Sequence, residues 1–230
     1  MSFATQVLDF YFSLPNSFTP PNGVETIFPF ENPETRRVME LFFNKYYADD
    51  NPRTLIFGIN PGRHGAGITG IGFTDPILLE EKCGIANTLE RRSELSAQFI
   101  CEVVDAYGGP EKFYGDFLFT TVLPFGLLKN GKNYNYYDDK ETLAYFDGFI
   151  KESIKKQMAF DGARKGIVCI GQGKNLKYLE TLNKEEKLFE RIDVIPHPRW
   201  VMQYRRKEKE KYIQTYIDTL VAAKEGREHA

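Results

Sequence analysis

Four short apolar runs along the chain predict buried β-strands. They are RTLIFGI at residues 53–59, GDFLFTTVLPF at 115–125, KGIVCIG at 165–171 and FERIDVIP at 189–196. In most of these runs the apolar residues follow one another instead of alternating with polar ones. That pattern is typical of strands covered on both faces, as in parallel sheets.

Segments with helix signals alternate with these strands. We expect helices over residues 3–13, from Pro33 onward, and over 93–109, 138–160, 173–182 and about 201–223. Asn32 before Pro33 is a good helix start, and Asp138 and Glu141 have the spacing of a capping box. The alternation predicts an α/β fold, with a mainly parallel sheet between two layers of helices.

The chain has no internal repeat and no low-complexity linker, and its 230 residues fit one domain. We therefore expect a single domain over residues 1–230. Within it, residues 1–31 form an N-terminal helix and an ordered arm, with Phe18, Phe28 and Phe30 as anchors.

The composition narrows the class of protein. Hydrophobic residues make up 42% and the net charge is -2, so the chain is neither disordered nor basic overall. A nucleic-acid-binding role would have to depend on a local basic patch. The three cysteines are widely spaced, which indicates free thiols and no metal site. No segment approaches the roughly 18 apolar residues that span a bilayer, so we expect a cytoplasmic protein.

In a parallel α/β sheet the ligand crevice lies beyond the carboxyl ends of the strands. That rule selects four loops, at residues 59–75, 122–137, 171–175 and 196–204. These loops also hold the unusual residues of the chain.

The first loop combines an asparagine with many glycines. Asn60 leaves the strand, and glycines stand at positions 58, 62, 65, 67, 70 and 72. Glycines let backbone N–H groups approach a ligand closely, but the spacing fits neither a Walker loop nor GxGxxG. The Asn60 amide could orient a water or a base edge; the plainer interpretation is that it caps a turn.

The last loop holds His197 between two prolines. A lone histidine is usually structural, but this one is expected opposite Asn60 at the same edge of the sheet. Arg199, Trp200, Val201, Met202 and Arg205 follow it. Apolar residues flanked by cations suit insertion into a stacked duplex. The alternative is an ordinary helix start with Trp200 in the core.

Two further segments carry weaker signals. Residues 130–137 mix asparagines and Lys132 with three tyrosines, which suits base stacking and edge recognition, although a surface turn explains it equally well. GQGKNL at 171–176 precedes a helix whose N-terminus could take a DNA phosphate near Lys174; a plain strand-to-helix turn is the alternative.

Together these segments resemble a known family. GINPG at 58–62, followed by TGIGF at 69–73, resembles the first motif of uracil-DNA glycosylases. HPR at 197–199 looks like a shortened second motif of the single-strand-selective monofunctional (SMUG-type) branch. The resemblance extends from about residue 30 to 207. It looks like a divergent bacterial-type subgroup of that branch.

The resemblance implies a three-layer α/β/α sandwich around a four-stranded parallel sheet. It also implies roles: Asn60 positions the attacking water, His197 hydrogen-bonds uracil O2 and Phe73 stacks on the flipped base. The expected substrate-binding residues are Gly58, Ile59, Pro61, Gly62, His64, Phe73, Thr121 and Asn133. The expected DNA-binding residues are Gly65, Gly171, Lys174, Arg199, Trp200, Val201, Met202 and Arg205.

Three features depart from the family pattern. Thr121, or else Thr120, stands where the family has its uracil-reading asparagine, and Asn133 or Asn135 could substitute. Arg63 and His64 replace a proline and an aromatic residue. The shortened second motif means that the intercalating segment is set differently.

The leading hypothesis is a monofunctional DNA glycosylase that flips uracil, or a related deaminated base, out of DNA and cleaves its N-glycosidic bond. That chemistry requires no metal or cofactor, and the expected partner of the monomer is DNA. The alternative is a catalytically inactive DNA- or nucleotide-binding module of the same fold. A small-molecule hydrolase is weaker, because no acidic cluster for Mg²⁺ stands in the predicted loops.

Overall fold

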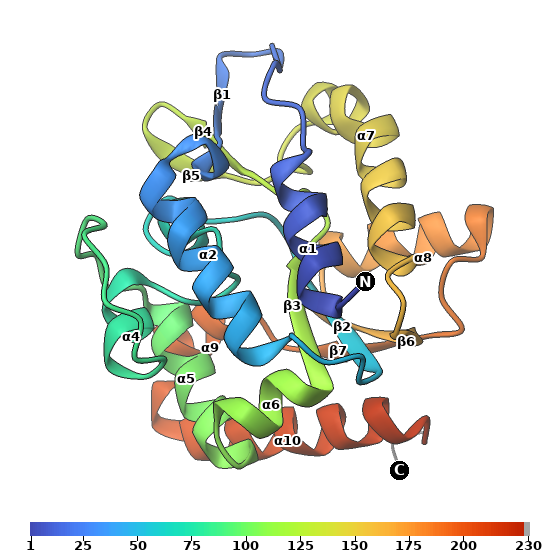
Figure 1. The fold of residues 1–230 in the computed structure, drawn as a ribbon. Helices are drawn as coiled ribbons and strands as arrows, with labels where there is room; N and C mark the ends of the chain where they lie inside the picture. The colour runs from blue at the N-terminus through green and yellow to red at the C-terminus, as the bar shows by residue number, and fades with distance from the viewer. Residues whose placement is uncertain (228–230) are drawn as a thin grey trace.

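A four-stranded parallel sheet forms the centre of the molecule. The computed structural model describes residues 1–227. The strands are β2 (Arg53–Gly58), β3 (Phe117–Thr121), β6 (Ala163–Ile170) and β7 (Arg191–Ile195), in the order β3-β2-β6-β7 (Figure 1). All three neighbouring pairs are parallel. The α/β architecture expected from the alternating pattern is confirmed.

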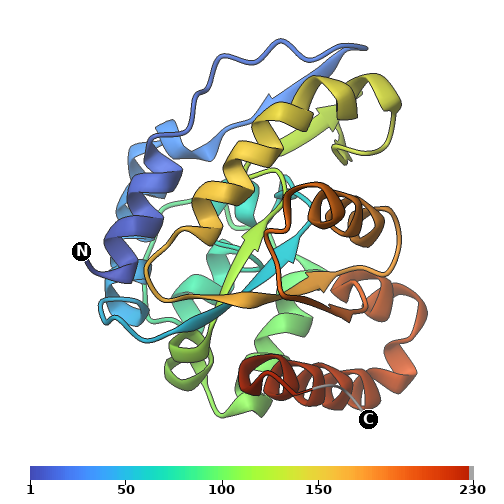
Figure 2. The same cartoon turned by 90° about the vertical axis from the view of Figure 1, so that its right-hand side faces the viewer.

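Helices cover both faces of this sheet. The longer ones are α1 (Phe3–Phe12), α2 (Pro33–Tyr46), α5 (Leu95–Tyr107), α7 (Lys140–Met158), α8 (Lys174–Glu186) and α10 (Lys209–Glu225). The shorter ones are α3 (Ala66–Thr69), α4 (Pro76–Glu81), α6 (Pro110–Asp116) and α9 (Pro198–Tyr204), with 3-10 turns η1 (Pro29–Glu31) and η2 (Arg206–Glu208). In Figure 2, α10 lies below the sheet while α7 and α8 lie above it.

Capping residues set where the helices begin. Asn32 caps α2 as expected, because its side chain accepts hydrogen bonds from Glu34 N at 2.8 Å and Thr35 N at 3.3 Å. The residue that caps α7 lies one position later than expected. Asp139, not Asp138, accepts from Thr142 N at 2.8 Å.

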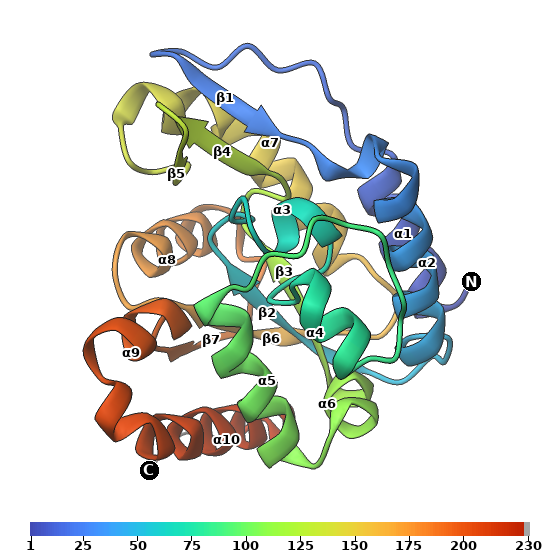
Figure 3. The same cartoon turned by 90° about the vertical axis from the view of Figure 1, so that its left-hand side faces the viewer.

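A second, antiparallel sheet was not expected from the sequence. It joins β1 (Val24–Ile27) to the hairpin of β4 (Gly126–Lys129) and β5 (Lys132–Tyr134), at the top of Figure 3. Asn130 and Gly131 form the turn with φ of 52° and 68°. Asn-Gly is the preferred pair for such a two-residue turn, so this signal was present in the sequence.

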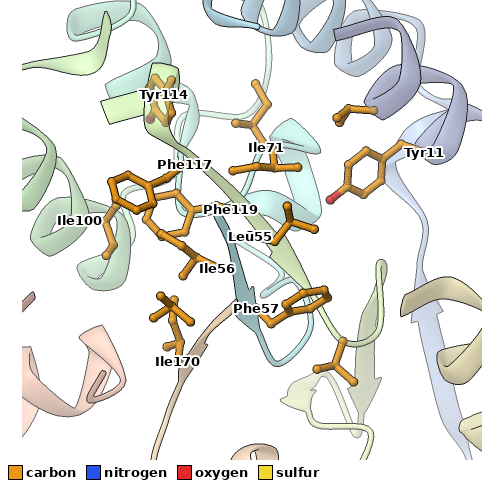
Figure 4. Packing of buried hydrophobic residues seen from close by; sticks show 14 of the residues in the cluster. Tyr11, Leu55, Ile56, Phe57, Ile71, Ile100, Tyr114, Phe117, Phe119 and Ile170 are labelled. Carbon is orange, nitrogen blue, oxygen red and sulfur yellow. The ribbon is translucent and has the colours of Figure 1, made fainter. Parts of the chain in front are cut away.

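The core continues on both faces of the central sheet. Successive residues of β2 point to opposite faces, so Leu55 packs on the side of Tyr11 and Ile56 on the side of Ile100 (Figure 4). Leu55 and Ile56 are fully buried. The arm is anchored as expected, for example by Phe18, whose ring lies 4.7 Å from that of Phe125.

The C-terminal segment is two helices where the sequence pattern indicated one. Helix α9 ends at Tyr204, the 3-10 turn η2 follows, and α10 runs from Lys209. In the part of the chain that the structure describes, no helix is both long and apolar enough to cross a membrane.

Candidate active site

A cavity of about 560 Å³ opens where the strands of the central sheet end. Its walls come from the loop after β2, the end of β3, the β4–β5 hairpin, the start of α5 and the start of α9; Figure 3 shows these elements in one view. It brings together Gly58, Ile59, Asn60, Pro61, Gly62, His64, Phe73, Thr121, Asn133, His197 and Arg199 from the predicted set.

The glycines after β2 allow the loop to pack tightly on itself and on its neighbours. Gly67 N donates to Gly62 O at 2.9 Å, and a Cβ on Gly67 would lie 2.6 Å from that oxygen. A Cβ on Gly65 would overlap the Glu94 carboxylate. Gly70 has a φ of 71°, which favours glycine. Several of these glycines are therefore required for the loop to pack this closely.

Asn60 is held by two hydrogen bonds from the far end of the hairpin. Its Nδ2 donates to Tyr134 O at 3.0 Å, and its Oδ1 accepts from Tyr136 N at 3.3 Å. The Asn60 amide thus connects two segments that are distant in sequence. The plainer interpretation had expected it to cap its own turn. Because Oδ1 has a second lone pair, an oriented acceptor remains for a water molecule in the cavity.

His197 is a half-buried, neutral donor. It lies extended between Pro196 and Pro198, as predicted, and its Nδ1 accepts from Arg199 N at 3.2 Å. Burial, with a smaller contribution from the Arg199 charge, lowers the pKa of His197 to about 4. The proton of the neutral ring therefore lies on Nε2, which can donate to a ligand.

Phe73 lies beside His197 in a strained conformation. Its φ is 53°, in the left-handed region that bulky residues rarely adopt. Its ring centroid is 5.1 Å from that of Phe119 and 6.4 Å from that of His197. A strained backbone that persists at a cavity wall is typical of functional sites.

The structure distinguishes Thr121 from Thr120. Thr121 lines the cavity, but its hydroxyl donates to Leu123 O at 2.8 Å. Thr120 points to the other face, where its hydroxyl lies 3.3 Å from the Tyr11 hydroxyl. Asn133 and Asn135 both line the cavity. Asn133 Oδ1 accepts from Arg63 N at 3.0 Å.

Glu94 is a cavity residue that the sequence analysis missed. It precedes α5, and Asp75 Oδ2 accepts from its backbone N–H at 2.9 Å. Burial raises the pKa of Glu94, and the nearby Asp75 charge acts in the same direction, while Arg199 opposes them. Nothing in the local pattern marked it, because it stands in the first turn of the helix expected over residues 93–109, away from the loops that were selected. No group of three or more His, Cys, Asp or Glu that could hold a metal ion occurs within residues 1–227.

The predicted DNA-binding residues separate into exposed and buried ones. Arg199 lines the main cavity, whereas Gly171, Lys174 and Trp200 line a second one beside it. Trp200 is 40% exposed and not in the core. By contrast, Val201, Met202 and Gly65 are buried. Val201 and Met202 pack in the core and do not present an apolar wedge, so Arg199, Trp200 and Arg205 are the exposed part of that segment.

Comparisons with known proteins identify the family of this chain. The family model described as the uracil DNA glycosylase superfamily matches residues 45–221. The crystal structure of wild-type Pedobacter heparinus SMUG2 is similar over 96% of this chain and 98% of that chain, with 40% identity and a TM-score of 0.91. A search of curated protein sequences gives no match. The chain therefore belongs to the uracil DNA glycosylase superfamily, and its similarity to SMUG2 supports the SMUG-type branch within it.

Proposed function

We propose that the protein is a monofunctional DNA glycosylase that releases uracil, or a related deaminated base, as the first step of base excision repair. The observation that carries the proposal is that Asn60, Phe73 and His197 line a single cavity, of about 560 Å³. A base inside a duplex is out of reach of such a cavity, so the target nucleotide has to be flipped out or single-stranded.

The walls of the cavity match the demands of the reaction. Cleavage of the N-glycosidic bond leaves positive charge on the sugar and negative charge on the departing base. Neutral His197 offers Nε2–H to a base oxygen as the charge develops, which is worth roughly 3 kcal/mol for a well-placed donor. Asn60 Oδ1, already oriented by Tyr136 N, holds the attacking water. The ring of Phe73 stacks on the base.

Two features of the cavity bear on which base fits. The Thr121 hydroxyl is engaged with Leu123 O, so it does not replace the paired contacts of an amide. Asn133, Asn135 and Lys132, together with Glu94, are among the polar groups of the cavity that can read the base edge. Burial raises the pKa of Glu94, which stands near the Arg199 charge.

The direct test is base release. Single- and double-stranded oligonucleotides with a central uracil are incubated with excess protein, and abasic sites are cleaved with alkali. We expect strand breaks at the uracil position. Intact strands in both substrates would rule out uracil release as the activity. A panel with other deaminated bases then defines the preferred substrate.

Substitutions test the assigned roles. We expect Asn60→Ala and His197→Ala each to lower the rate of uracil release tenfold or more, with DNA binding largely kept. Asn16→Ala, on the exposed arm, is the matched control and should release uracil at the wild-type rate. Melting temperatures are measured alongside, because Asn60 also fixes the hairpin. Wild-type rates in both active-site variants would refute the roles.

The alternative function is a DNA-binding module without catalysis. The engaged Thr121 hydroxyl is the observation that favours it. It predicts salt-sensitive DNA binding with no base release in the same assay.

A further inference from the structure

A second cavity of about 350 Å³ adjoins the one that holds Asn60. It lies between the loop after β6, the start of α8 and the start of α9. Its walls are Ile59, Tyr137, Gly171, Gln172, Gly173, Lys174, Asn175, Pro196, His197 and Trp200. Ile59 and His197 line both cavities, so the two cavities are neighbours. A DNA strand with one nucleotide in the Asn60 cavity therefore runs past the second cavity.

An exposed tryptophan borders this second cavity. Trp200 is 40% exposed, although such a large apolar ring is usually well buried. Its orientation is nonetheless fixed. The Tyr212 ring meets it edge-on at 5.7 Å, and the Arg205 guanidinium lies 5.4 Å from its centroid. A ring held in place at a cavity wall loses little conformational entropy when a flat ligand stacks on it.

Another part of the wall combines an aromatic ring with a cation. Tyr137 is half-buried, and the Lys174 Nζ lies 5.7 Å from its ring centroid. Lys174 begins α8, a helix of 13 residues with no side-chain cap and no acidic residue in its first turn. Side chains at Gly171 and Gly173 would meet nothing within 4 Å, so the approach to this helix start is open. The cavity therefore offers aromatic surface beside positive charge, which suits a nucleotide.

We propose that the second cavity is a stacking subsite for the base of the nucleotide next to the flipped one. The base lies against Trp200 and Tyr137, and its phosphate lies near Lys174 and the start of α8. The subsite deepens the proposed function, on which it rests, by adding recognition of a neighbouring base. Because every base has an aromatic face, stacking tolerates any sequence but requires that a base be present.

The single tryptophan provides a direct readout. Trp200 is the only tryptophan of the chain, and a base stacked on its ring quenches its fluorescence. Single-stranded oligonucleotides carry 2′-fluoro-uridine at the target position, which resists cleavage. One has bases on both sides; two others have an abasic spacer at the 5′ or the 3′ neighbour. We expect strong quenching with the first oligonucleotide and its loss with one of the spacer oligonucleotides.

Substitutions connect the quenching to affinity. Trp200→Ala should weaken binding of the complete oligonucleotide by roughly five- to hundredfold, the usual contribution of one stacked base. It should not weaken binding of the oligonucleotide that lacks the stacked base. Trp200→Phe should keep most of the affinity. Tyr204→Ala is the matched control, because Tyr204 lies on the same helix, is 67% exposed and lines neither cavity.

The outcomes separate this subsite from the proposed activity. Quenching that is equal for all three oligonucleotides, or absent, overturns the subsite even where uracil release is efficient. Quenching that depends on one neighbour supports the subsite even where no base is released. An equal loss of affinity in Trp200→Ala for the complete and the spacer oligonucleotides shows a structural role for Trp200 and overturns the proposal.

Discussion

Burial, more than residue type, sets the charge of His197. A free histidine is half-protonated near pH 6.5, but this ring is enclosed by the cavity walls and stands near the Arg199 charge. The fold therefore delivers a neutral donor at the pH of the cell without a carboxylate partner. The same physical cause acts on Glu94, where burial raises the pKa of an acid.

The lowered pKa of His197 predicts a pH-dependent stability. Between its folded pKa of about 4 and its unfolded value of 6.5, the unfolded chain binds more protons. The free energy of unfolding should therefore rise with pH through this window, and His197 should contribute roughly 2–3 kcal/mol of that rise. In His197→Gln, urea titrations between pH 4.5 and 7 should show a flatter rise. An unchanged slope would contradict the assignment.

Arg53 shows a second effect of burial on one residue. It begins β2, is fully buried and donates to Tyr114 O at 2.7 Å and Asn51 O at 3.0 Å. Its guanidinium also forms a 2.8 Å ion pair with Asp49. Its place at the start of the apolar run RTLIFGI did not reveal this burial, because no local pattern distinguishes a buried cation from an exposed one.

Removal of Arg53 should destabilise the protein severely. Arg53→Ala leaves several buried carbonyl groups without donors, and we expect a loss of about 3–5 kcal/mol in unfolding free energy. Arg37→Ala is the control, since Arg37 is half-exposed and forms a surface pair with Glu34 that is worth under about 1 kcal/mol. Denaturant titration of both variants checks this; equal losses would show that burial of Arg53 is unimportant.

At the scale of elements, the loop after β2 packs between the β4–β5 hairpin and the segment before α5. A Cβ on Gly62 would lie 3.3 Å from Asn133 Nδ2 on β5 and 3.6 Å from Glu94 Oε1 before α5. Asn60 is bonded to the end of the same hairpin. The hairpin therefore positions the loop, and its own Asn130-Gly131 turn was a local signal that the sequence analysis passed over.

Two glycine substitutions should distinguish the effect of tight packing in this loop from the general effect of replacing a glycine. In Gly67→Ala the new methyl meets Gly62 O at 2.6 Å, so the loop must shift, and we expect uracil release to fall tenfold or more. In Gly148→Ala, inside α7, the methyl meets nothing within 4 Å. That variant should gain about 0.5–1 kcal/mol and keep its activity. Rates and denaturation curves are compared; full activity in Gly67→Ala would show that the loop tolerates movement.

At the scale of the whole molecule, the arrangement of charge matters more than its sum. The net charge is -2, yet Arg63, Lys132 and Arg199 line the main cavity and Lys174 the second. These cations come from four separate segments. The folded chain therefore has a local basic surface that its composition does not reveal.

This arrangement predicts salt-dependent DNA binding. The logarithm of the association constant should fall with the logarithm of salt concentration, because bound phosphates release counterions. Arg63→Gln and Lys174→Gln should each reduce the slope by about 0.7–0.9. Lys165→Gln, at the amino end of β6 and paired with Glu190, is the control and should leave it unchanged. Equal slopes in all variants would show that DNA phosphates do not contact Arg63 or Lys174.

The sequence by itself determined the order of the central strands and helices along the chain and the main residues of the cavity. Apolar runs and caps such as Asn32 act locally, so they could be read one segment at a time. The rule that ligands lie beyond the carboxyl ends of parallel strands placed Asn60, Phe73 and His197 at one edge. Their presence in a single cavity agrees with that placement.

Only the tertiary structure decided which neighbours of those residues are available. Thr121 faces the cavity while Thr120 faces away, Val201 is buried while Trp200 is exposed, and Glu94 enters the site from another segment. A strand points successive side chains to opposite faces, and the direction that is inward depends on packing between segments distant in sequence. Those long-range contacts have no local pattern, because they exist only once the layers have packed.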